Sequence, residues 1–424
     1  MTHDPEVQDF YERYPYPRPV ADLENYRRRW QDRGRRRADF HLFWPDRPYG
    51  ENRTILIAGS GTSQAAKHAL RWPRARVIGI DFSATSVRHT QQLRRKYDLA
   101  NLEIHQLSIE RVSELHTTFD QVVCTGVLHH LADPDVGLHA LRDVLNPNGA
   151  MHLMVYAPYG RAGIYMLQEF FRCIGVHARD DEIRDLIIAL GALPARHPLT
   201  RLLREAPDFR QQAALADALL HPQDRAYSVP QLSNLIDHAG LRFGRWVRQA
   251  PYSPLCGVMA GLPQSSRIAA LQDMQQYAAA ELFRGTMASH SVIVYRDDSA
   301  ARSQQICFSG HAWLDYVPVL LPDTLCVEER LPPGAVAVLI NRAHTHNDIY
   351  LPIDAHEKRM FDAIDGERSV GKVLGGANQE LGRALFERLW WHDQVVFDTS
   401  QSVSALPGVS QSRNDSEDPS HHRP

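Results

Sequence analysis

Short apolar runs alternate with helix-like stretches from Arg53 to Tyr159. The run Thr54–Ala58 is followed at once by glycines, as is typical of a buried parallel strand. Similar runs predict strands at 76–80, 102–107, 120–124 and 150–155, with helices at 64–70, 83–97 and 133–145 and a turn at 146–149. Strands that alternate with helices form right-handed β-α-β units. The pattern therefore predicts an α/β fold with a doubly wound parallel sheet.

The remaining segments divide the chain into further parts. Residues 1–52 are rich in arginine and aromatics and are interpreted as an N-terminal arm or strap. The α/β domain is predicted over 53–296, with a helical insertion at about 160–230. After a polar stretch, residues 306–400 read as strand, helix, turn, helix, helix, strand, which predicts a small α+β winged-helix-like domain. Residues 401–424 have few apolar side chains and are predicted to be a disordered tail.

Composition narrows the function classes. The chain has 47 Lys and Arg residues and 50 Asp and Glu residues, a net charge of −3, which argues against nucleic-acid binding. The five cysteines form no Cys-x-x-Cys pair, which argues against a disulfide framework and favours a reducing cytoplasm. The sequence contains no run of about 18 apolar residues, so no membrane span is predicted. No metal is expected either, because His311, His344, His346 and Asp348 have no recognisable ligand spacing.

A glycine-containing turn follows the first predicted strand. In an open α/β sheet, ligands bind beyond the carboxyl ends of the strands. Gly59-Ser60-Gly61-Thr62 stands there, and two glycines allow the backbone to turn tightly and approach a ligand. Gln64 occupies the position of the third glycine of a dinucleotide-binding loop. The pair of glycines alone is explained equally well by a plain turn.

An acidic residue ends the second predicted strand. Asp81 follows the glycines by about 20 residues, where a carboxylate can accept hydrogen bonds from both hydroxyls of a ribose. The alternative is an acidic residue at a helix start, because Asp81 precedes the capping residue Ser83.

A third motif completes the set and spans residues 119–134, with the sequence Phe119-Asp-Gln-Val-Val-Cys-Thr-Gly-Val-Leu-His-His-Leu-Ala-Asp-Pro134. With the glycine turn and Asp81, it resembles the class I S-adenosylmethionine (SAM)-dependent methyltransferases. The most similar group includes the ubiquinone- and menaquinone-biosynthesis methylases. The resemblance implies SAM as the cofactor. It implies cofactor contacts at Gly59, Ser60, Gly61, Thr62, Asp81, Phe82, Ser83, Ser108, Ile109, Gly126 and Val127.

The sequence departs from this family at the adenine position. An acidic residue is common there, whereas this chain has Ser108, with Glu110 two positions further on. A second family element, Tyr11-Glu-Arg-Tyr-Pro-Tyr-Pro17, precedes the core in a subset of these enzymes. Tyr16 in this strap could close over the cofactor, or the arm could pack outside the sheet.

Methyl transfer requires the acceptor, methyl carbon and sulfur to be held in line, and some acceptors must also lose a proton. His129 and His130 are the candidate catalytic residues, although packing or cofactor contact would also explain the pair. Tyr156 and Tyr159 at the fifth strand are candidate substrate contacts. The insertion at 160–230 is expected to be a lid over the acceptor pocket, or else a support for a homodimer interface.

Three functions follow from this interpretation. The first is a cytoplasmic methyltransferase that acts on an O, N or C atom of a small-molecule acceptor. The second is a protein methyltransferase whose C-terminal domain presents or regulates a protein or peptide target. The third is a SAM-binding regulator without turnover.

Overall fold

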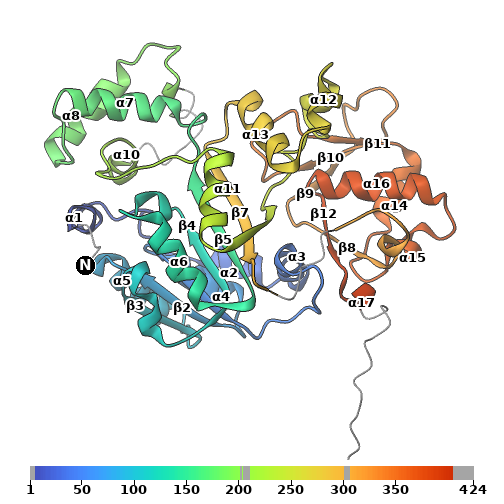
Figure 1. Cartoon of the computed structure of the whole chain (residues 1–424), viewed down its shortest axis with the longest axis horizontal. Coiled ribbons are helices and arrows are strands. Elements are labelled where there is room, and N and C mark those ends of the chain that lie inside the picture. The colour runs from blue at the N-terminus through green and yellow to red at the C-terminus, as the bar shows by residue number, and fades with distance from the viewer. Residues whose placement is uncertain (1–4, 201–202, 204–210, 300–305, 404–424) are drawn as a thin grey trace, which may run out of the picture.

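A seven-stranded sheet forms the centre of the computed structural model, which describes residues 5–200, 203, 211–299 and 306–403 (Figure 1). Its order is β3-β2-β1-β4-β5-β7-β6, with β1 to β5 parallel and β7 antiparallel to both neighbours. The predicted doubly wound α/β sheet is confirmed. The strands are β1 Thr54–Ala58, β2 Arg76–Asp81, β3 Leu102–Gln106, β4 Phe119–Thr125, β5 Leu145–Tyr156, β6 Leu241–Trp246 and β7 Ser289–Arg296.

Helices cover both faces of the sheet because the strands are apolar on both sides. In β1, Leu56 and Ile57 point to opposite faces and are both fully buried. One face packs on α6 Pro134–Val144, α11 Val229–His238, α13 Asp273–Arg284 and the 3-10 helix η1 Ile109–Leu115. The other packs on α3 Arg33–Phe43, α4 Gln64–Arg71 and α5 Ala84–Lys96, with α2 Glu24–Trp30 against α4.

The segment between β5 and α11 is helical, as the sequence predicts. It contains α7 Ala162–Cys173, α8 Asp180–Gly191 and α10 Gln212–Leu219, which share one apolar cluster. The N-terminal helix α1 Pro5–Arg13 packs against α8 and α10 through Phe10 and Tyr14. The hydroxyl of Tyr14 also donates to Asp180 Oδ1 at 2.7 Å. Helix α1 and the insertion therefore form one wall, at the left of Figure 1.

The C-terminal domain lies at the other end of the molecule (Figure 1). Its second half has the predicted order of strand, three helices and strand, whereas the sequence did not indicate β8 to β10. The winged-helix assignment stays a prediction. Its elements are η5 Ala312–Asp315, β8 Val317–Leu320, β9 Thr324–Val327, β10 Ala337–Asn341, β11 Leu351–Ile353, α14 Ala355–Asp362, α15 Val370–Leu374, α16 Gln379–Trp391, β12 Val395–Asp398 and α17 Ser400–Val403.

A buried carboxylate joins this domain to the sheet. Asp393 lies 3.4 Å from Arg245 and 3.0 Å from His344, and it accepts a hydrogen bond from Ala250 N at 3.0 Å. The charged neighbours hold the pKa of Asp393 below its usual value despite burial, which by itself would raise it. On the second face of the sheet, β12 lies against α3, and Val396 joins the core there.

One feature departs from the expected organisation. The predicted turn at 146–149 lies inside β5, because β5 already pairs with β4 from Leu145 and a bulge beside Asp120 absorbs the shift in register. The Asp120 carboxylate stabilises this arrangement by accepting from Thr54 N and Asn146 Nδ2, both at 2.8 Å. Most of the predicted tail, residues 404–424, lies outside the described residues. Among those described, no helix combines the length and apolar character that a membrane span needs.

Candidate functional site

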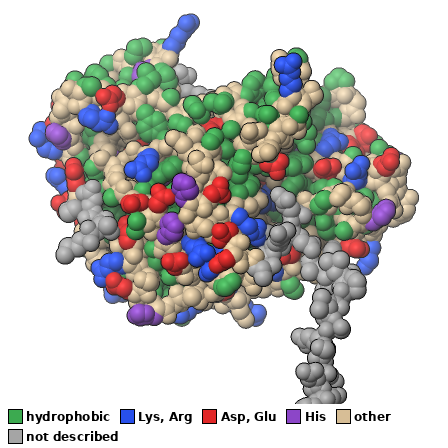
Figure 2. All heavy atoms as spheres, in the orientation of Figure 1, with side chains coloured by type: hydrophobic (Ala, Val, Ile, Leu, Met, Phe, Trp, Pro, Cys, Tyr) green, Lys and Arg blue, Asp and Glu red, His purple; other side chains and the backbone are tan. Residues whose placement is uncertain are grey.

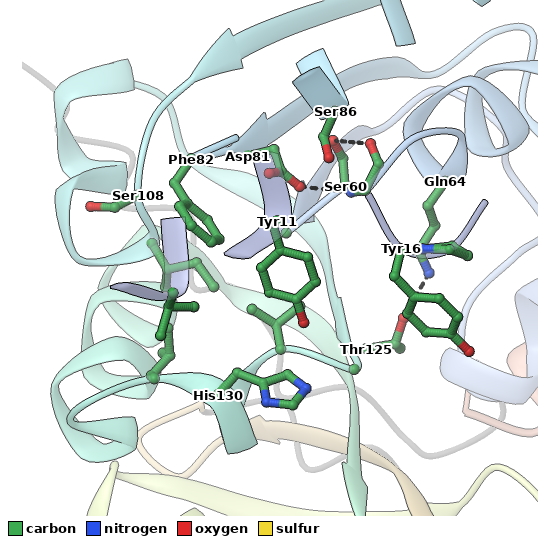
Figure 3. Close-up of a pocket in the computed structure, with 18 of the residues that line it drawn as sticks. Tyr11, Tyr16, Ser60, Gln64, Asp81, Phe82, Ser86, Ser108, Thr125 and His130 are labelled. Atoms are coloured by element: carbon green, nitrogen blue, oxygen red, sulfur yellow. Dashed lines mark hydrogen bonds between the residues drawn. The ribbon is translucent and has the colours of Figure 1, made fainter. Parts of the chain in front are cut away.

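A cavity of about 400 Å³ lies at the carboxyl ends of β1, β2 and β4, beside the point where the strand order reverses. This is the position at which open α/β sheets bind ligands. Figure 3 shows side chains from the strap, the glycine turn and the β4 end converging on it. The sequence-predicted residues that line it are Tyr16, Gly59, Ser60, Gly61, Asp81, Phe82, Ser108, Ile109, Gly126, Val127, His130 and Tyr156.

The glycine turn needs both of its glycines. Gly59 and Gly61 have φ angles of 69° and 53°, in the left-handed region that side chains disfavour. A Cβ atom on Gly59 would lie 2.4 Å from Cγ2 of Val127. The backbone therefore approaches the β4 end more closely than any other residue would allow.

Asp81 links this turn to the next helix. Its carboxylate accepts from Gly61 N at 2.8 Å and from Ser83 N at 2.9 Å. Burial raises the pKa of Asp81 to about 6, although these two hydrogen bonds oppose the shift. The carboxylate thus organises the turn and lines the cavity at the same time. This position is compatible with both interpretations of Asp81, as a ribose contact and as an acidic residue at a helix start.

The four other predicted residues lie behind the cavity wall or away from it. Thr62 donates to Pro17 O at 2.8 Å and ties the strap to the glycine turn. Ser83 caps α5 by accepting from Ser86 N. His129 is fully buried behind His130, and Tyr159 is 42% exposed near the insertion.

At the expected adenine end, Ser108 and Glu110 both reach the cavity wall. The Glu110 carboxylate therefore lies where it could take the role of the acidic residue that the family commonly has at the Ser108 position. Whether either contacts adenine stays a prediction.

The opposite end of the cavity contains residues that sequence reasoning missed. Tyr11 of α1 and Asp217 of α10 both line it, and the Tyr11 hydroxyl donates to Asp217 Oδ1 at 2.9 Å. In Figure 3, the Tyr11 ring faces His130 across the cavity. Burial, together with Asp217, raises the pKa of Tyr11 well above its ordinary value, and burial raises that of Asp217. Tyr11 and Asp217 are 206 residues apart, so no local pattern could have revealed the pair.

Imidazole and carboxylate groups gather beside this end. Two groups of three, His129 with His130 and Asp224, and His130 with Asp217 and His221, have potential metal-ligand atoms within 4.8 Å of one another. The histidines whose spacing predicts no metal, His311, His344 and His346, belong to neither group. Asp217 and Asp224 lie in the insertion and its exit, so their approach to the β4 end is a property of the tertiary fold.

Comparison with known proteins places the cavity in a recognisable domain. Residues 56–151 match a methyltransferase domain. An uncharacterised protein of Synechococcus sp. is 34% identical over 248 residues, which cover 56% of this chain and 58% of that protein. Trans-aconitate 2-methyltransferase of Deinococcus radiodurans is 31% identical over 130 residues, covering 30% of this chain and 46% of the enzyme. The matches thus span about half the length of these relatives.

A solved structure resembles most of the chain. PKMT2 from Rickettsia typhi, solved in complex with AdoHcy, has a TM-score of 0.60 at 16% identity and covers 87% of this chain and 76% of its own. At this identity the likeness concerns the fold. Together, the matched domain and the strand order identify the sheet as Rossmann-like and of the methyltransferase type.

Proposed function

We propose that this protein is a SAM-dependent methyltransferase that transfers a methyl group to an O, N or C atom of a small-molecule acceptor. The observation that carries the proposal is the Gly59–Gly61 turn with Asp81, which lines a cavity at the switch point of a matched methyltransferase domain. The AdoHcy complex of PKMT2, which has a similar fold, is consistent with this cofactor.

In this proposal Asp81 accepts the ribose hydroxyls, because a carboxylate forms charge-assisted hydrogen bonds. The close backbone of the glycine turn holds the methionine part, and Ile109 packs on the adenine. Bound SAM supplies the electrophilic methyl group. The protein supplies alignment and a site closed to water by α1 and α10.

An acceptor with an O–H or N–H group must also lose a proton. His130 and Asp217 are the two groups on the described cavity wall that suit this role, and Tyr156 is a contact for the acceptor. The raised pKa of Asp217 makes it a stronger base than an exposed carboxylate. His129 is buried behind His130 and would act only through it.

The size and enclosure of the cavity favour a small acceptor. Its volume of about 400 Å³ lies near the lower end of the range for ligand pockets, roughly 300–1,000 Å³, and the cofactor would fill much of it. The protein-methyltransferase alternative assigns target presentation to the C-terminal domain. That domain lies at the far end of the molecule from α1, which counts against direct presentation (Figure 1).

The charged and apolar side chains on the surface support our proposals on partners. Lys and Arg side chains are interspersed with Asp and Glu over the face in Figure 2, which does not favour nucleic acid. On the insertion, which we propose to act as a lid, Phe170, Ile174 and Ile188 are 48%, 57% and 73% exposed. These side chains would suit a homodimer interface, and sedimentation velocity of the full chain at several concentrations tests it. A cytoplasmic location stays a prediction.

The first experiment is calorimetric titration of the full chain with SAM and, separately, with NADH. We expect saturable binding of SAM alone, and binding of NADH alone would overturn the cofactor assignment. The second incubates the protein with methyl-labelled SAM and a cell extract separated into small molecules and proteins. Label in the small-molecule fraction supports the proposal, whereas label confined to protein supports the alternative. SAM binding without S-adenosylhomocysteine formation would indicate a regulator.

A further inference from the structure

Three potential ligand groups meet behind the acceptor end of the cavity. His129 and His130 belong to the 3-10 helix η2 Leu128–His130 after β4, and Asp224 lies between α10 and α11. One ring nitrogen of each histidine and one oxygen of Asp224 lie within 4.8 Å of one another. His129 and His130 are 0% and 6% exposed, and the Asp224 side chain is 2% exposed. The group is therefore closed to solvent except through the cavity.

Several polar atoms of this group have no bonding partner within the described part of the chain. They include both ring nitrogens of His129 and Oδ1 of Asp224. A buried polar atom without a partner destabilises the folded state, so such atoms are rare in native proteins. A neutral imidazole has one N–H group and one lone pair, so one ring nitrogen of His129 and Oδ1 of Asp224 offer lone pairs near one point. This indicates a missing ligand that accepts them.

The surrounding contacts orient two of the three groups, His130 and Asp224, as the outer contacts of a metal site would. His130 Nδ1 lies 2.7 Å from Gln223 O. A carbonyl can only accept, so Nδ1 carries the hydrogen and Nε2 has the free lone pair. Asp224 Oδ2 accepts from Gln168 Nε2 at 2.9 Å and lies 3.5 Å from Arg161 Nη2, which leaves Oδ1 available. Metal-binding histidines and carboxylates are usually held by such contacts.

The charge balance also favours a cation. Asp217 and Asp224 are both buried here, and the Arg161 guanidinium near Asp224 can neutralise only one carboxylate. Two imidazoles and one carboxylate suit zinc, iron or manganese, whereas magnesium and calcium prefer oxygen ligands alone.

We propose that His129, His130 and Asp224 bind one divalent transition-metal ion. Bonds of about 2.0–2.2 Å place ligand atoms roughly 3–4 Å apart, so small side-chain adjustments would close the site. The alternative group of His130, Asp217 and His221 is unsuitable. His221 Nδ1 accepts a hydrogen bond from Gln223 N at 2.9 Å, so its Nε2 carries the hydrogen and has no lone pair to offer.

The ion would lie against the cavity wall, because His130 belongs to both sites. There it could polarise an oxygen atom of the acceptor, which lowers the pKa of a bound hydroxyl group. His130 would then be a ligand, and Asp217 would remain as the proton acceptor. The inference about the ion shares only His130 with the proposed methyl-transfer site, since His129 and Asp224 do not line the cavity.

The test is Zn²⁺ titration of the full chain after treatment with a chelator, in competition with a chromophoric chelator. We expect one equivalent to bind. His129→Gln and Asp224→Asn should each weaken binding at least tenfold, and Gln168→Met should weaken it about 10–100-fold by releasing Asp224. The matched control is His139→Gln, an exposed histidine on α6 that should leave Zn²⁺ affinity unchanged. Calorimetry with SAM on each variant reports whether the fold and the proposed cofactor site survive.

Equal Zn²⁺ affinity in all variants, or binding below one equivalent, would overturn the proposal. If the variants do not fold, the wild type decides the matter through its Co²⁺ form. Proton NMR should show paramagnetically shifted ring signals from two histidines, and their absence would also overturn the proposal. SAM binding without a metal would refute the ion alone, and metal binding without SAM would refute the cofactor assignment alone.

Discussion

Replacing Asp81 with asparagine tests the cofactor site most directly. Both carboxylate oxygens accept backbone hydrogen bonds, from Gly61 N and Ser83 N. An amide offers one oxygen and one NH₂ group, so one of the two backbone N–H groups must face another donor. The unmade bond should lower the free energy of unfolding by about 1–3 kcal/mol. Loss of the charge-assisted ribose contact should weaken SAM binding by about 1.5–3 kcal/mol, which is roughly 10–150-fold in Kd.

The dependence on pH gives a second measure of the same contact. Burial raises the pKa of Asp81 to about 6 in the free protein, and only the ionised form can accept both hydroxyls. SAM affinity should therefore be constant above about pH 7 and fall by up to about tenfold per unit below pH 6. The asparagine variant should lack this decline, because its amide does not titrate.

The assay is isothermal calorimetry with SAM between pH 5 and pH 8, with chemical denaturation as the stability measurement. Asp120→Asn is the matched control, because Asp120 also accepts a backbone hydrogen bond but lies at the start of β4, away from the cavity. It should lose stability and keep its SAM affinity. A folded Asp81→Asn protein that binds SAM within twofold of the wild type would refute the ribose assignment.

Three further substitutions test the surrounding structure. Gly61→Val should lower the melting temperature and block SAM binding, because φ of Gly61 is +53° and the added Cβ would lie 3.2 Å from Pro17 Cδ. The control Gly261→Val should have neither effect, because no described atom lies within 4 Å of the added Cβ. Asp393→Ala should lower the free energy of unfolding, measured by urea denaturation, by about 3–5 kcal/mol, because it removes the carboxylate that pairs with Arg245 and His344. The control is Asp365→Ala at an exposed ion pair, and an equally small loss of stability in both variants would contradict this account. Tyr11→Phe should speed amide hydrogen exchange in α1 about fivefold, because it removes the hydrogen bond to Asp217. Tyr350→Phe, at an exposed tyrosine, is the control. Unchanged exchange in the Tyr11→Phe variant would show that this hydrogen bond does not hold α1 in place.

Much of the central sheet could be predicted because its signals are local. The apolar run of β1, its glycines and Asp81 lie within 28 residues, and the parallel α/β arrangement follows from the alternation of strands and helices. The cavity could be expected for the same reason, since the carboxyl ends of these strands meet at one edge. The position of β5 was less predictable, because four residues of β5, 146–149, separate the pairing of Leu145 from that of Ala150.

Tertiary contacts explain what the sequence did not reveal. Asp217 belongs to an ordinary helical pattern, and only the docking of α10 over the cavity brings it to Tyr11. Strands β8 to β10 of the C-terminal domain were missed because they are only four or five residues long. The grouping of His129, His130 and Asp224 also depends on the return of the chain after the insertion.

The contact between α3 and β12 has a consequence for how the protein is made. Arg37 and Asp398, which lie 361 residues apart in the chain, form an ion pair at 3.0 Å, and His41 lies 3.3 Å from the same carboxylate. Translation therefore releases α3 long before the strand that covers it. Until β12 has been synthesised, an apolar side of α3 stays open to other chains, which is a common route to aggregation. A truncated product ending near residue 296 would keep that surface open permanently, so β12 is the element that closes it.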